Sequence, residues 1–188
     1  MKLKRKKIEP IPKINRRLFK FWSEAVRSRS GFVCEYCGAT RGTTNTNGKP
    51  TKIDAHHLMN RDIHNCPLKF DIRNGIALCP SCHKFRPDDS FHLNPVVTMR
   101  WMNINHPERV DFVAANYKVR IALDNRAILY AIEEYLKSKQ PLDIDTLLKL
   151  DIEEAQKKEA LKAEALLAKQ PQGSLFDAKP SEPEVPAT

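Results

Sequence analysis

The stretch 73-RNGIALCPSCHK-84 decides the fold, because within a few residues it changes from a strand pattern to the start of a helix. Its first half is short and apolar, and 51-TKIDAHHL-58 upstream also has the length and composition of a strand. Pro80 suits the first turn of a helix, which we expect to cover Ser81 to Arg86. The sequence therefore predicts two short strands, over 51–58 and 73–79, followed by a short helix.

Helical patterns flank this unit on both sides. Upstream, apolar residues recur at helical spacing from Arg16 to Arg29, and Gly31 ends the pattern. Downstream we expect one helix that Pro107 opens and that reaches Ile121, one capped by Asp124 or Asn125 that reaches Leu136, and one from about Asp145 to Lys169. The expected fold class is α+β, a small strand–strand–helix core between an N-terminal helix and a C-terminal helical region.

Length and composition allow one medium domain with appended segments. The chain has 188 residues, and 41% of them are hydrophobic, which suffices for one modest core. We expect a basic flexible arm over 1–15, a domain over 16–140, a charged helix over 141–169 and a disordered, proline-containing tail over 170–188.

Charge is unevenly distributed along the chain, whose formal net charge is +9. Residues 141–188 hold 6 of the 32 Lys/Arg and 10 of the 23 Asp/Glu, which leaves 26 basic and 13 acidic residues in 1–140. A basic body with an acidic tail favours a polyanion such as nucleic acid as partner, although a merely solvated basic surface is a common alternative.

No apolar run approaches the length of a membrane span, and the basic N-terminus has no signal-peptide core behind it. We therefore expect a cytoplasmic protein without a membrane partner. In that reducing compartment, five cysteines indicate metal ligation rather than disulfides.

Four of the cysteines form two C-x-x-C pairs, Cys34 with Cys37 and Cys79 with Cys82. Each pair can bind one side of a tetrahedral zinc ion about 2.3 Å from each sulfur, and four thiolates leave no position open for water. Such a zinc ion would be structural and would help to fold a loop-rich segment. Ordinary buried thiols or a redox couple are the alternatives, although neither pair follows a thioredoxin-like strand. Cys66 is left over as a free thiol.

A second cluster carries a family resemblance. The pair His56–His57 at the end of the first strand, Asn74 at the start of the second and His83 just inside the helix resemble the HNH nucleases, whose core is a ββα-metal (His-Me finger) unit. The C-x-x-C pairs frame this core as they do in zinc-containing members, and the layout is similar to small phage recombination nucleases of the NinG type. The resemblance covers residues 34–86.

The resemblance implies a role for each of these residues. His56 and His83 would bind a catalytic divalent ion. His57 would act as the general base, and Asn74 would brace the loop that holds this base. Asp54 lies two residues before His56 on the same strand face, where it is suited to orient a ligand or a histidine tautomer.

Further charged and histidine residues lie near the motif. Candidates for contacts with phosphates, or else solvated charges, are Arg61, Arg73 and Lys84. Surface or capping roles are expected for the histidines outside the motif, which are His64, His92 and His106.

The implied function is a metal-dependent endonuclease that hydrolyses DNA to a 5′-phosphate and a 3′-hydroxyl, in phage or bacterial recombination, repair or DNA processing. If a phage encodes it, the cytoplasm is that of the bacterial host. Mg²⁺ is the expected catalytic ion, with Mn²⁺ or Ni²⁺ as alternatives because imidazoles bind them. The alternative function is a non-catalytic zinc protein that binds nucleic acid, but a second cluster beside a complete cysteine site favours the enzyme.

The tail contains 172-QGSLF-176, which resembles peptides that bind the bacterial sliding clamp. Gln172 would make backbone contacts while Leu175 and Phe176 enter an apolar pocket. Alternatively, these two apolar residues fold back onto the body or have no partner.

Overall fold

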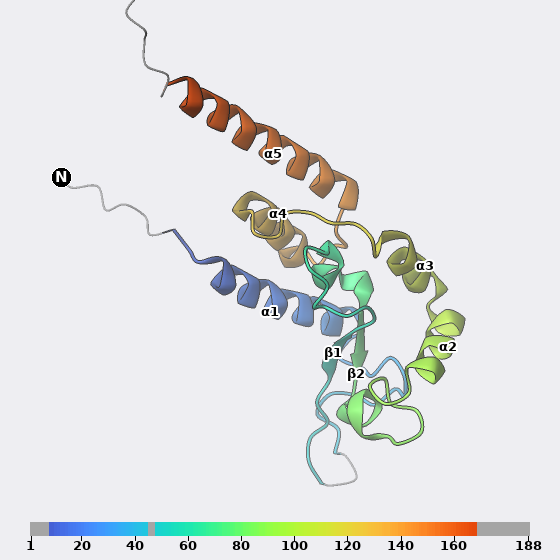
Figure 1. The fold of residues 1–188 in the computed structure, drawn as a ribbon. Helices are drawn as coiled ribbons and strands as arrows, with labels where there is room; N and C mark the ends of the chain where they lie inside the picture. Colours follow the sequence, from blue (N-terminus) through green and yellow to red (C-terminus); the bar gives the residue numbers. More distant parts are fainter. Residues whose placement is uncertain (1–7, 45–47, 169–188) are drawn as a thin grey trace, which may run out of the picture. The chain divides into compact units, whose positions relative to one another are not determined.

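The computed structural model describes residues 8–44 and 48–168, and within them the chain is α+β, mostly helical with a small two-stranded sheet (Figure 1). The expected α+β class is therefore confirmed. In chain order the elements are α1 (Ile11–Arg29), β1 (Asp54–His57), the helical turns η1 (Pro67–Phe70) and η2 (Ile72–Asn74), β2 (Gly75–Leu78), the short π-helix η3 (Ser81–Phe85), α2 (Pro95–Asn105), α3 (Pro107–Asn116), α4 (Arg126–Lys137) and α5 (Ile144–Leu167).

The strands β1 and β2 form an antiparallel hairpin in which Asp54 pairs with Leu78 and His57 with Gly75. Side chains alternate between the faces of a strand, so Asp54 and His56 share one face of β1 and His57 lies on the other. Strand β2 is buried throughout, whereas β1 is half-buried. The short helix η3 follows β2 and completes the strand–strand–helix order.

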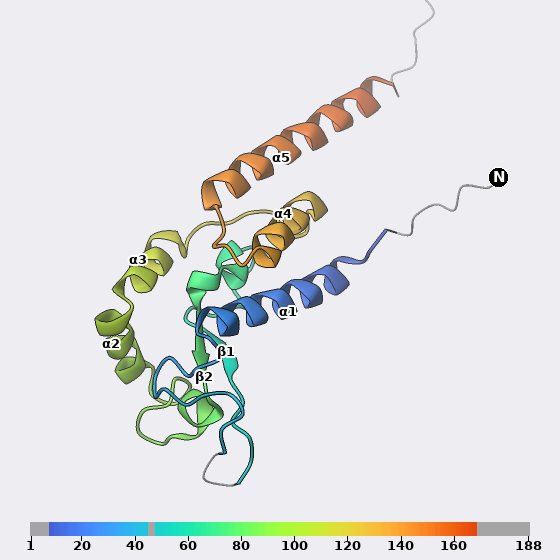
Figure 2. The same ribbon diagram turned by 180° about the vertical axis from the view of Figure 1, so that it is seen from behind.

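Helix α1 packs beside the hairpin through one apolar face (Figures 1 and 2). The buried residues of that face are Ile14, Leu18, Trp22, Ala25 and Val26. Gly75 permits the close approach, because a Cβ at this position would collide with Val26 and press on Trp22. The indole Nε1 of Trp22 also donates a hydrogen bond to the carbonyl of Asp71, at 2.9 Å. The position of β2 and of the turn before it relative to α1 is thus fixed by packing and by a buried hydrogen bond.

The start of α1 corrects the expected boundary at residue 15 between the arm and the first helix. The helix begins at Ile11 rather than near Arg16, directly after the extended residue Pro10. Arg17 fixes this start, because its guanidinium pairs with Glu9 at 2.7 Å and with Glu133 of α4 at 2.6 Å.

The C-terminal helices follow the expected pattern in part. Asn125 caps α4, and its side chain accepts a hydrogen bond from the backbone N–H of Ala127 at 2.9 Å. Helix α3 ends at Asn116 and does not reach Ile121, which is instead buried and donates its N–H to the carbonyl of Asn65. Helix α2 has no counterpart among the expected helices.

The chain divides into two compact units after Asp151, inside α5. The beginning of α5 belongs to the first unit, because Ile144 and Leu147 are part of its hydrophobic core. The body therefore extends beyond the expected boundary at residue 140.

Some expectations from the sequence concern the ends of the chain and the membrane. Among the residues that the structure describes, no helix is long and apolar enough to span a membrane. The expected clamp-binding residues lie outside the described residues, and they are Gln172, Leu175 and Phe176.

Candidate active site

The two C-x-x-C pairs come together in space. The sulfur atoms of Cys34, Cys37, Cys79 and Cys82 all lie within 4.8 Å of one another, and those of Cys37 and Cys79 are 3.7 Å apart. Sulfurs bound to one tetrahedral zinc ion lie about 3.8 Å apart, given bonds of about 2.3 Å. This cysteine cluster can therefore hold a metal such as zinc. Cys66 is buried elsewhere as a free thiol.

Glu35, inside the first cysteine pair, ties the cluster to the rest of the body. Its carboxylate pairs with Arg29 of α1 at 3.1 Å and with Arg109 of α3. It also accepts a hydrogen bond from the backbone N–H of Ala77 in β2, at 2.8 Å. Burial raises the pKa of Glu35, but the hydrogen bond from Arg109 and the other contacts outweigh it, so the pKa lies below its usual range. The carboxylate therefore links two helices and a strand to the cysteine loop.

A second cluster consists of three histidines. One ring nitrogen each of His56, His83 and His92 lies within 4.8 Å of the other two. The Nε2 atom of His83 is 3.2 Å from Nδ1 of His56 and 3.1 Å from Nε2 of His92. Nitrogens bound to one tetrahedral ion lie about 3.3 Å apart, given bonds of 2.0–2.1 Å. The spacing fits a shared metal ion.

Asp54 sets the tautomer of the central histidine. Its Oδ2 lies 3.2 Å from Nδ1 of His83, and a carboxylate accepts a hydrogen bond, so Nδ1 carries the proton. The lone pair of His83 then resides on Nε2, the atom that faces His56 and His92. A metal-binding histidine with its other nitrogen on a carboxylate is a common arrangement, because it fixes the ring and increases its basicity.

Three different segments bring the histidines together. His56 comes from β1 and His83 from η3, the same short helix that carries Cys82 of the cysteine cluster. His92 comes from the loop after η3, which is held by backbone hydrogen bonds from Phe91 to Cys82 at 2.9 Å and from His92 to His83 at 3.2 Å. A metal bound by the cysteines would therefore also stabilise the histidine cluster.

His56 and His83 favour the neutral form. Burial, followed by repulsion from His83 and His92, lowers the pKa of His56 to about 3. Burial also lowers the pKa of His83, although the hydrogen bond with Asp54 opposes this shift. Neutral imidazoles are the form that binds metal ions.

His57 lies on the other face of β1, held against α1. Its ring stacks on Trp22, with 3.7 Å between centroids and 11° between planes, and the edge of Phe19 lies nearby. Its Nε2 is 2.9 Å from the carbonyl of Lys69. A carbonyl only accepts, so Nε2 is the protonated nitrogen and Nδ1 keeps its lone pair. The pKa of His57 lies below its usual value, because the effect of burial outweighs that of the hydrogen bond to Lys69, which raises it.

Asn74 is fully buried and connects the segments that follow β1. Its Oδ1 accepts from the N–H of Met59 at 2.7 Å, and its Nδ2 donates to the carbonyls of Leu68 at 3.0 Å and Met59 at 3.3 Å. The backbone carbonyl of Asn74 accepts from the N–H of Leu58 at 2.9 Å. These contacts hold the chain immediately after His57. They also hold Leu68, the neighbour of Lys69, whose carbonyl accepts a hydrogen bond from His57.

An open hollow joins the histidines. Its volume is about 580 Å³, and the residues that line it are Ala55, His56, His57, Leu58, Asn60, Arg61, Asp62, His83, Lys84 and His92. Arg61 and Lys84 are exposed and add positive charge. The hollow is thus open to a large substrate and combines four imidazoles with two cations.

Two predictions from the sequence need correction. Arg73 was a candidate phosphate contact, but its guanidinium pairs with the buried Asp71 at 2.7 Å, donates to the carbonyl of Leu142 at 2.6 Å and lies 3.4 Å above the ring of Phe112. These partners assign Arg73 to internal packing. For His92 the sequence favoured a surface or capping role. The residue is exposed, as expected, but its ring also joins the histidine cluster. The hollow brings together the predicted residues His56, His57, Arg61, His83 and Lys84, and the four cysteines form their own cluster.

Comparisons of the chain with protein-family models, with curated proteins and with solved structures each found no match.

Proposed function

We propose that this protein is a metal-dependent phosphodiester hydrolase that nicks DNA. The observation that carries the proposal is that two neighbouring residues of β1 offer the two groups such a reaction needs. His56 belongs to the three-histidine cluster, which could hold a metal ion, and His57 beside it has an oriented imidazole that could act as a base. Hydrolysis of a phosphodiester needs both a charge-stabilising ion and a base for the attacking water. The resemblance to HNH nucleases leads to the same proposal.

The histidine cluster would hold the catalytic ion. When bound, a divalent ion would stabilise negative charge on the phosphate oxygens and on the leaving 3′-oxygen. Three imidazoles suit Zn²⁺, Ni²⁺ or Mn²⁺ better than Mg²⁺, which prefers oxygen ligands and retains several waters. With His92 as a third ligand, we propose a transition-metal ion in place of the Mg²⁺ expected from two histidines.

His57 would be the general base. The carbonyl of Lys69 holds the proton on Nε2, and Nδ1 would therefore accept the proton of the attacking water. Burial lowers the pKa of His57 below its usual value, so the imidazole is neutral at neutral pH and can accept a proton. Asn74 would act as a positioning residue, since it fastens the backbone that follows His57.

Arg61 and Lys84 would hold the phosphates on either side of the reacting bond. Both line the hollow with the histidines. Their side chains would supply charge-assisted contacts to phosphate oxygens. The products would be a 5′-phosphate and a 3′-hydroxyl.

A supercoiled-plasmid nicking assay tests the proposal. The zinc-loaded protein is assayed without further ions and with Mg²⁺, Mn²⁺, Ni²⁺ or Zn²⁺ in turn, and the ends of the nicked strand are labelled. We expect nicking with at least one transition metal and a 5′-phosphate at the cut. Binding of the plasmid without nicking under every ion would instead support the non-catalytic nucleic-acid-binding function.

A further inference from the structure

We propose that a row of cations on α1 and on the loops before β1 binds the phosphate backbone of duplex DNA and leads it to the histidine cluster. The members of this basic row are Arg16, Lys20, Arg27, Arg41 and Lys52. The identity of the polyanion as DNA rests on the proposed function above. The location of its binding surface does not depend on the catalytic step.

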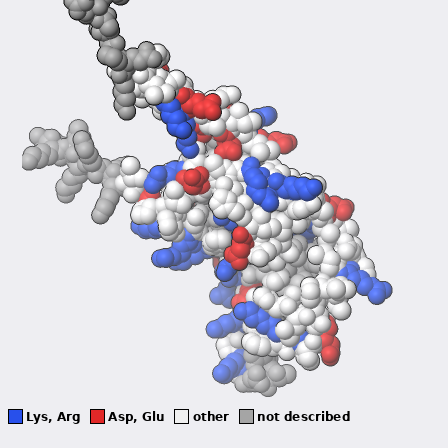
Figure 3. All heavy atoms as spheres, viewed as in Figure 1, with Lys and Arg blue, Asp and Glu red and all other residues white. Residues whose placement is uncertain are grey.

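The first part of the row follows one face of α1. Arg16, Lys20 and Arg27 lie four and seven residues apart, close to whole turns of a helix, and span about 16 Å of its axis. All three line one open hollow of about 650 Å³. Figure 3 shows Lys and Arg side chains gathered along the α1 side of the molecule.

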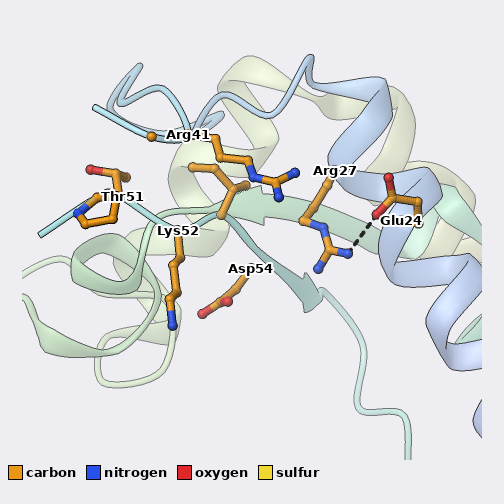
Figure 4. Close-up of a pocket in the computed structure, with 9 residues that line it drawn as sticks. Glu24, Arg27, Arg41, Thr51, Lys52 and Asp54 are labelled. Carbon is orange, nitrogen blue, oxygen red and sulfur yellow. Dashed lines mark hydrogen bonds and ion pairs between the residues drawn. The ribbon is translucent and has the colours of Figure 1, made fainter. Parts of the chain in front are cut away.

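The second part surrounds an adjoining hollow of about 440 Å³ (Figure 4). Arg27 and Glu24 line both hollows, so the two adjoin at these residues. In the close-up the guanidinium of Arg41 extends toward Arg27. The side chains of Lys52 and Asp54 lie near each other, farther from Glu24. Lys52 and Arg41 are exposed.

Asp54 connects this second hollow to the candidate active site. Its carboxylate lines the hollow and contacts Nδ1 of His83. The residues that follow it in β1, from Ala55 to His57, line the hollow of the histidines. A DNA strand whose phosphate backbone follows the basic row would therefore arrive beside the proposed metal ligands.

The row is largely without internal partners. Within the described part of the chain, Arg27 pairs with Glu24 at 2.9 Å, and Arg41 lies 5.0 Å above the ring of Phe32. Arg16, Lys20 and Lys52 have no ion pair with a described carboxylate. Five cations against Glu24 and Asp54 leave a net positive surface, the feature that attracts a phosphate backbone.

The rigidity of the row favours duplex DNA. Three of its members are fixed on one helix, and the phosphates of a duplex strand are also held at regular spacing. A single strand would have to be ordered to match this spacing, which costs conformational entropy. Sequence-tolerant single-strand sites place exposed aromatic platforms between the cations. Phe19 and Phe21 also line the first hollow, but both are partly buried against the core, and Phe19 packs on Phe70.

The test is the salt dependence of binding to a short DNA duplex, followed by fluorescence anisotropy on the full-length, zinc-loaded protein without added catalytic ion. The double variant Arg41→Ser with Lys52→Ser is compared with wild type. Loss of two phosphate contacts should reduce the slope of log K against log [salt] by about 2 and weaken binding roughly tenfold or more. The exchange Arg41→Lys with Lys52→Arg, which keeps both charges, should restore most of the slope.

The control variant is Arg100→Ser with Lys118→Ser, which removes the same charge from α2 and from the turn after α3. These elements lie on the side of the hairpin opposite α1 (Figures 1 and 2). A slope and affinity equal to wild type in the Arg41/Lys52 variant would overturn the proposal, as would tighter binding of single-stranded than of duplex DNA.

The outcome is distinguishable from failure of the proposed function. A wild-type protein that never nicks DNA, combined with a reduced slope in the variant, supports the basic row and contradicts the nuclease. Normal nicking with an unchanged slope contradicts the basic row and leaves the nuclease standing.

Discussion

The imidazole of His57 lies flat on the indole of Trp22, with 3.7 Å between the ring centroids. Trp22 is itself held by its hydrogen bond to the carbonyl of Asp71. The stack fixes the plane of the imidazole, and the carbonyl of Lys69 fixes its rotation within that plane. His57 is therefore oriented before any substrate binds, and such preorganisation lowers the entropic part of a reaction barrier.

Asn74→Ala should impair both stability and cleavage. It leaves buried backbone groups of Met59 and Leu68 without partners, at about 1–3 kcal/mol for each group left unpaired, and it loosens the chain after His57. Urea unfolding and the nicking rate at a temperature where the variant is folded measure the two effects. Asn116→Ala, which removes one hydrogen bond at the end of α3, is the control and should have little effect. An Asn74→Ala variant with the wild-type nicking rate would disprove the positioning role.

His92→Ala should weaken metal binding at the histidine cluster. Loss of a residue that merely supports a ligand typically costs 10–100-fold in metal affinity, so loss of a direct ligand should cost at least roughly 100-fold. Calorimetric titration of the zinc-loaded protein with Ni²⁺ measures this effect. His64→Ala, a change at an exposed histidine outside the cluster, should titrate like wild type. Equal Ni²⁺ affinity in both variants would remove His92 from the site.

Cys34→Ser with Cys82→Ser should release zinc and destabilise the loops around the hairpin. Elemental analysis after dialysis should find one equivalent of zinc in wild type and much less in this variant. Cys66→Ser removes the buried cysteine outside the cluster, and it should retain the zinc. Equal zinc content in all three proteins would show that these cysteines do not bind it.

Glu133 should contribute pH-dependent stability. Burial raises its pKa, but the hydrogen bonds from Arg17 and Lys137 lower it by more, so the folded-state pKa lies below the usual value of 4.5. A carboxylate whose pKa is lowered by folding stabilises the folded state at pH values above its unfolded-state pKa. This contribution is lost as the pH falls through the folded-state pKa.

The measurement is the free energy of unfolding of wild type and of Glu133→Gln as a function of pH. The variant should be less stable at pH 7, by about 1.5–3 kcal/mol for hydrogen bonds to a charged group. The difference should shrink when the pH falls below 4.5. A difference that stays constant down to the acid transition would contradict the pairing.

Much of the core could be predicted because its signals are local. The apolar run of β2, Pro80 and the two C-x-x-C pairs are contiguous patterns, and their physical causes act within a few residues. Asp54 and His56 could be placed on one face because strand alternation is strict. Asn74, which we expected to open the second strand, is the last residue of η2, immediately before β2.

His92 could not be placed from the sequence. It is nine residues from His83, a spacing that belongs to no regular helix or strand. Its position depends on backbone hydrogen bonds that fold the loop back onto η3, with Phe91 buried as an anchor.

Two other departures have different causes. Helix α2 begins with Pro95, and Val96, Val97 and Thr98 follow. Their β-branched side chains lower helix propensity, so the pattern did not predict a helix. Arg73 lies two residues after Asp71, and their pairing depends on how the turn η2 folds, since Asp71 also caps this turn by accepting from the N–H of Arg73.

The most direct test of the central claim is the single-turnover nicking rate of His57→Ala, measured against His64→Ala and wild type with the histidine site loaded equally with metal. A general base contributes about 10²–10⁴-fold to such a reaction, so His57→Ala should be slower by at least about 100-fold, while it binds DNA and metal normally. The His64→Ala variant should nick at the wild-type rate. Nicking by His57→Ala at the wild-type rate would contradict the account.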